Sequence, residues 1–91
     1  MSEPAELVAE LLEGVGGLEL PSGIANSLLA KLDTALQKLE DANEKNDIAA
    51  INSLQAFINA IEAQRGKKIP EADADALIAD AMEIIELLST E

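Results

Sequence analysis

The side chains of this 91-residue chain that could do chemistry are mostly carboxylates, since it holds 18 Asp and Glu, no His and no Cys. The closest approach to a metal-binding pattern is Asp41, Asn43, Lys45 and Asp47, which alternate as the first ligands of a calcium loop do. The pattern fails because a lysine stands at its fifth position and Asn52 stands where the closing glutamate belongs. We therefore expect no metal site and no cofactor.

Catalysis is disfavoured for a related reason. Carboxylates are frequent, but no pair is recognisably buried beside a partner, and a nucleophile would have to be activated without a histidine. Zinc and other soft-ligand sites are disfavoured as well, because their usual histidine and cysteine ligands are missing. The sequence therefore predicts a protein that is not an enzyme.

The one concentrated basic segment is Arg65-Gly66-Lys67-Lys68. Its cations could simply offset the negative end of the preceding helix and nearby acids. Alternatively, Arg65, Lys67 and Lys68 form a docking point for an acidic partner or a cell-surface polymer, because arginine can bind a carboxylate or phosphate through two hydrogen bonds. These three residues are our candidate partner-binding site. A second candidate is an apolar patch, exposed if the first helix packs loosely, of Leu12, Val15, Leu18, Leu20 and Met82.

Charge limits the partners further. The formal net charge is −12, and all six basic residues lie between Lys31 and Lys68. A field of this sign repels phosphate backbones and anionic membrane surfaces, so we expect no nucleic-acid binding. No run reaches the roughly 20 apolar residues that span a bilayer, so we expect no membrane insertion. The start, MSEPAEL, does not read as a signal peptide. The chain is then either cytoplasmic or a piece of a longer secreted chain.

The composition and the spacing of the apolar residues both predict helices. Hydrophobic residues make up 48% of the chain, with a single aromatic, and Ala and Leu are strong helix formers. Apolar residues recur at helical spacing, and the intervening polar segments are short enough to join antiparallel neighbours. The sequence predicts one all-α domain over 1–91, an antiparallel bundle of three long helices plus a short N-terminal helix. The predicted helices cover 4–13, 22–41, 47–64 and 70–88.

The boundaries of these helices have local causes. Gly14, Gly16 and Gly17 should stop the first helix, because glycine loses much backbone entropy in a helix. Ser22 is a good N-cap for the second. Gly66 should end the third in a left-handed conformation.

The helix over 47–64 is apolar over most of its circumference, which is typical of a buried helix. One wide arc holds larger apolar side chains around Phe57: Ala50, Ile51, Leu54, Ile58 and Ile61. A second arc of small side chains, including Ala56 and Ala60, would allow another helix to approach closely. We expect this helix to be the centre of the core.

Three segments resemble a known family: LPSGIANSLLAKLDTAL, AAINSLQAFINAIEAQRGKKI and ADALIADAMEIIELL. Together they are similar to the FIMAH domain, a small helical module found near the C-termini of extracellular and surface proteins of bacteria and archaea. Pro70 departs from the pattern, which would have a capping serine there. The resemblance implies a non-enzymatic accessory module in an extracellular or cell-surface setting, and it supplies no ligand.

Three functional hypotheses follow. The first is a non-catalytic interaction or spacer module excised from a secreted or cell-surface multidomain protein, whose partner is a protein or a cell-surface polymer. The second is a free-standing acidic cytoplasmic adaptor that binds a basic partner. The third is a designed helical bundle, suggested by the alanine-rich regularity.

Overall fold

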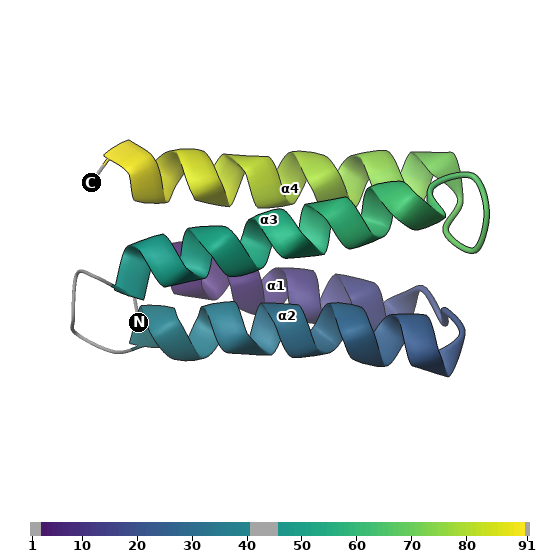
Figure 1. Ribbon diagram of the computed structural model, residues 1–91, viewed down its shortest axis with the longest axis horizontal. Coiled ribbons are helices and arrows are strands. Elements are labelled where there is room, and N and C mark those ends of the chain that lie inside the picture. The colour runs from purple at the N-terminus through teal and green to yellow at the C-terminus, as the bar shows by residue number, and fades with distance from the viewer. Residues whose placement is uncertain (1–2, 41–45, 91) are drawn as a thin grey trace.

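A computed structural model describes residues 3–40 and 46–90 as four helices that pack against one another in an all-α bundle. The helices are α1 (Glu3–Gly17), α2 (Ser22–Glu40), α3 (Asn46–Gln64) and α4 (Glu71–Thr90). They run alternately up and down, so both ends of the described chain lie at the same end of the bundle (Figure 1). Asp41, Asn43 and Lys45, three of the four residues of the incomplete calcium-loop pattern, lie outside the described residues, and Asp47 lies in the first turn of α3.

Each helix packs against two neighbours. α2 packs beside α1 and α3, and α4 packs beside α3 and α1, which closes the ring (Figure 1). Within the described ranges, no Cα atoms of a diagonal pair come within 8 Å, so diagonal helices meet only through core side chains. This arrangement corrects one expectation. α3 is not surrounded by the other helices, because it occupies one corner of the ring and keeps an outward-facing side. Ile48, in its first turn, is 65% exposed.

The core fills the space between the four helices. Phe57 is fully buried, and its buried neighbours come from all four helices and from the turn before α4. They include Val8, Leu11, Val15, Leu28, Leu32, Leu54, Ile61, Ile69, Leu77 and Ile84. No buried polar side chain occurs among the residues that the structure describes. The bundle is therefore held together chiefly by burial of aliphatic surface.

The small side chains of α3 do face a close neighbour. α2 and α3 form the most extensive helix pair, and Gly23 and Ser27 of α2 line a shallow depression with Ala60 and Ala63 of α3. Small residues on both helices let the two backbones approach.

The first helix is longer than predicted. Gly14, Gly16 and Gly17 do not stop it, and α1 continues to Gly17. Val15 is fully buried, and a Cβ placed on Gly14 would lie 4.0 Å from Leu77 Cδ2 of α4. Burial of Val15 in the core offsets the roughly 1 kcal/mol that each helical glycine costs relative to alanine.

Two helices begin directly after a proline rather than at a capping side chain. Ala25 N donates to Pro21 O at 2.9 Å, and Ala74 N donates to Pro70 O at 2.9 Å. The prolines therefore occupy the N-cap positions, and Ser22 is the first residue inside α2 rather than its cap. The carbonyl of a proline can begin the helical hydrogen-bond ladder although the residue has no N–H.

Candidate functional site

The basic turn connects α3 to α4 over residues 65–70 and is held by its own backbone. Gly66 has φ of 74°, the predicted left-handed conformation. Its N–H donates to Ile69 O at 2.8 Å, and Ile69 N donates to Gln64 O at 3.1 Å. Gln64 O also accepts from Lys67 N at 2.9 Å, so the last carbonyl of α3 is satisfied twice. Ile69 is fully buried and anchors the turn to the core.

Arg65 is bound within the molecule. Its Nε donates to Asp75 Oδ1 at 2.7 Å, and an Nη donates to Asp75 Oδ2 at 3.1 Å, a two-bond pairing of guanidinium and carboxylate. The same Nη lies 3.7 Å from Glu71 Oε2. The hydrogen bond from Arg65 lowers the pKa of Asp75 below its ordinary value, and the same bond raises the pKa of Arg65. Arg65 therefore ties the end of α3 to the first turns of α4.

The three candidate cations are thus adjacent but differ in availability. Lys67 and Lys68 are exposed, and the structure gives their side chains no partner among the described residues, whereas Arg65 already holds two carboxylates. An anionic partner at this turn would meet two free ammonium groups and a largely neutralised guanidinium.

The apolar patch predicted around Leu12 and Met82 does not form. Val15 is buried, and Leu12, Leu18 and Leu20 are partly buried against the core. Met82 belongs to a different surface and is 58% exposed. The physical reason is that α1 packs firmly between α2 and α4, so its leucines are used in the bundle.

Met82 lies in a groove between α3 and α4, which we call the α3/α4 groove. It encloses about 510 Å³ and is mainly apolar. Four apolar side chains and three polar ones line it: Ile58, Ile78, Met82 and Ile85, with Gln55, Glu62 and Glu86. Ile58, Ile78 and Ile85 are half-buried, so their inner parts rest on the core while their outer parts face the groove.

The ion pair lies at one end of this groove. Arg65 directly follows α3, and its N–H donates to Glu62 O at 3.3 Å. On α4, Ile78 is three residues after Asp75, a spacing that makes them neighbours on a helix. The Arg65–Asp75 pair thereby fixes the spacing of the two groove walls where α3 ends and α4 begins.

The sequence analysis assigns Ile51 and Ile58 to the same apolar arc as Phe57. In the structure these two residues stand on one flank of α3, beyond the stripe that faces the core. The pattern cannot say whether such a flank meets another helix of the same chain or remains open.

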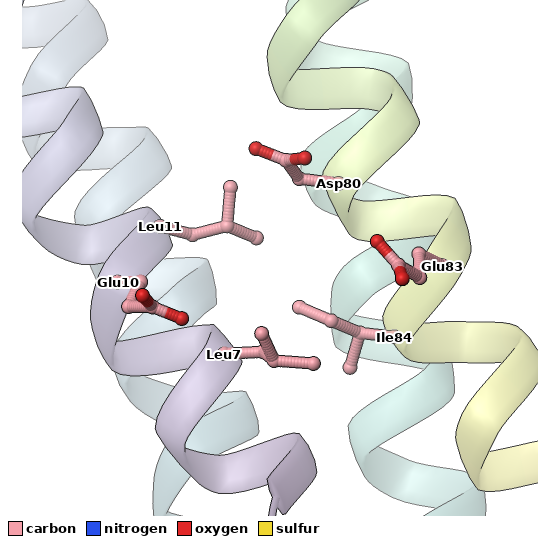
Figure 2. A pocket seen from close by; sticks show the side chains of 6 residues that line it. All are labelled: Leu7, Glu10, Leu11, Asp80, Glu83 and Ile84. Carbon is pink, nitrogen blue, oxygen red and sulfur yellow. The ribbon is translucent and has the colours of Figure 1, made fainter.

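A second cleft lies on the other side of α4, against α1 (Figure 2). Leu7, Leu11 and Ile84 point toward one another across it, and Glu10, Asp80 and Glu83 bring carboxylates around them. Its volume is about 240 Å³. Within residues 3–40 and 46–90, no group of three His, Cys, Asp or Glu side chains is arranged to hold a metal ion.

Comparison with known families gives one match. The FIMAH domain matches residues 8–86, which is nearly the whole chain. The chain belongs to the FIMAH domain family. Curated proteins and solved structures gave no significant match. In this FIMAH domain, none of the four described helices has the length and hydropathy to cross a membrane.

Proposed function

We propose that this FIMAH domain is a non-catalytic interaction module of a longer secreted or cell-surface protein, and that the α3/α4 groove is its binding surface. The observation that supports the proposal is the groove itself. Ile58, Ile78, Met82 and Ile85 form a continuous apolar lining on the outside of a bundle whose core is already filled. Contiguous exposed apolar surface bordered by polar residues is characteristic of protein-interaction sites.

The proposed setting rests on the family, which is associated with extracellular multidomain proteins. Reading the gene around this segment tests it. A signal peptide and further domains in the same reading frame support a secreted module, and a short cytoplasmic reading frame would favour the acidic adaptor instead.

The basic turn adds a second contact to this proposal. Lys67 and Lys68 are exposed on a turn that is fixed by hydrogen bonds and by buried Ile69, and loops held by rigid elements are common binding sites. Replacing both lysines by glutamine should leave the melting temperature almost unchanged and weaken binding of a partner that brings an acidic segment to this turn, beside the segment bound in the groove. Unchanged binding would remove the turn from the interface.

Photo-crosslinking tests the groove directly. A photoreactive residue at Met82, in the full-length parent protein in its source cells, should give a defined crosslinked product after irradiation. The matched control carries the same residue at Gln37, which is exposed on α2 away from the groove. A product from Met82 and none from Gln37 supports the groove as the interface. Equal products from both positions, or none from Met82, would contradict it.

A further inference from the structure

The α3/α4 groove exists because α3 carries more apolar surface than its neighbours cover. One arc of α3 packs on α2, and a second faces the core through Ala50, Leu54, Phe57 and Ile61. The third arc holds Ile58 in the groove, with Ile48 and Ile51 toward the start of the helix. On α4, Ile78, Met82 and Ile85 repeat the pattern three and four residues apart. Each wall of the groove therefore presents an outward-facing stripe of apolar side chains at helical spacing.

We propose that the occupant of this groove is one amphipathic helix of a partner protein, with apolar residues on the face it buries and Lys or Arg along its flanks. This inference rests on the proposed function and adds the chemistry of the partner. It places a fifth helix against two helices of the bundle, which is a common mode of peptide recognition.

The walls of the groove favour a helical occupant over an extended one. Both walls are helices whose backbone N–H and C=O groups bond within their own ladders, so an extended peptide would find no backbone partners there. A helix satisfies its own backbone and can bury one face at little cost. The groove runs from Gln55 to Glu62 on α3 and from Ile78 to Glu86 on α4. At 1.5 Å per residue these stretches are about 10–12 Å long, room for about two turns of the occupant.

The acidic residues at the rim of the groove favour a positively charged occupant. Glu62 borders the groove on α3 and Glu86 borders it on α4; the structure shows neither side chain in an ion pair or hydrogen bond among the described residues. The whole chain carries a net charge of −12. A second copy of this chain would bring the same charge and the same acidic rim, so it is repelled. Cationic side chains on the flanks of the occupant instead meet a carboxylate on either wall, and the overall field steers them inward.

Synthetic peptides test the inference. The probe is an amphipathic peptide of about 15 residues, near the length at which an isolated helix becomes marginally stable, with Leu and Ile on one face and Lys on its flanks. A charge-reversed peptide carries Glu in place of Lys, and a scrambled peptide keeps the composition without the helical period. Binding is measured by fluorescence anisotropy at low and high salt, and amide chemical shifts locate the site. We expect binding of the basic peptide alone, weakened by salt, with shifts centred on Ile58, Met82 and Ile85.

Two variants and a matched control sharpen the test. Met82→Gln keeps the length of an exposed side chain and should weaken binding about tenfold, since burial of methionine is lost. Glu62→Gln with Glu86→Gln should weaken it about three- to tenfold, from two exposed ion pairs. The control, Glu10→Gln with Glu83→Gln, makes the same change of net charge at the α1/α4 cleft and should have a much smaller effect. Circular dichroism confirms that each variant is folded.

Several results would overturn the inference. They are equal binding of the charge-reversed or scrambled peptide, equal loss in the control pair, or no saturable binding of the basic peptide. A dimer that dissociates on Met82→Gln would assign the groove to a second copy. If crosslinking from Met82 succeeds while the basic peptide fails, the interaction surface stands and only its proposed ligand is wrong.

Discussion

Replacing Phe57 by alanine removes the only aromatic ring of the chain from the centre of the bundle. Phe57 is fully buried, and buried side chains of all four helices form the cluster around it. Truncation of a buried phenylalanine costs about 3–5 kcal/mol, as lost transfer energy plus the energy of the remaining cavity. The helices around it can close that cavity only by moving their backbones, so we expect a value in this range.

The effect is large beside the total stability. A domain of this size is stable by about 5–15 kcal/mol, and each 1 kcal/mol corresponds to a shift of about 4–8 °C in melting temperature. Phe57→Ala should therefore melt at least about 12 °C lower than the parent. Thermal and urea unfolding followed by circular dichroism measure the change, and the urea midpoint should fall in parallel.

Ile48→Ala is the matched control on the same helix. Ile48 is 65% exposed, so its truncation leaves no cavity, and alanine is the better helix former. We expect a change within about 0.5 kcal/mol. If Phe57→Ala costs less than about 1 kcal/mol, or no more than Ile48→Ala, the ring is not enclosed and the packing described here is wrong.

Three further predictions concern the turn, the glycines and the charge. Gly66→Ala should lower the free energy of unfolding by about 1–2 kcal/mol, because φ is 74° there. Gly16→Ala has open space around its Cβ position and should raise the free energy of unfolding by about 0.5–1 kcal/mol. Urea unfolding of the two variants should therefore give changes of opposite sign. Since Arg65 lowers the folded-state pKa of Asp75 below its unfolded value of about 3.9, the pair stabilises above that pH and its contribution is lost as pH falls through the lowered pKa. In a carboxyl NMR titration, Arg65→Gln should raise the pKa of Asp75, and an unchanged pKa would contradict the pairing. Because the net charge is −12, sodium chloride should raise the melting temperature up to about 0.1–0.5 M, and a flat or falling curve would show that self-repulsion is unimportant.

Much of the fold could be read from local signals. Helical spacing located α2, α3 and α4 to within two residues at each described end, because burial on one face imposes a period of 3.6 residues. The left-handed Gly66 followed from its place after α3, since glycine alone adopts that conformation without cost. Membership of the FIMAH family followed from the same segments.

The errors arose where distant residues compete with local preference. The glycines placed the predicted end of α1 too early, because its last turn is held by burial of Val15 in a core whose other members lie far along the chain. The sequence left open whether Arg65 pairs with nearby acids or serves as a docking point. Its pairing with Asp75, ten residues away, depends on the conformation of the intervening turn, which only the structure shows.

What the sequence by itself determined is which residues are helical and which faces of each helix avoid water. Helix positions and apolar faces depend on helix propensity and on the period of the apolar residues, and both are set by residues close together in the sequence. What only the tertiary structure decided is which apolar face finds a partner within the chain. The structure divides the apolar surface of α3 into an arc against α2, an arc toward the core and an arc beside α4, and the ring of four helices covers the first two. The third lines the α3/α4 groove, because a helix at a corner of the bundle has only two neighbours to bury it.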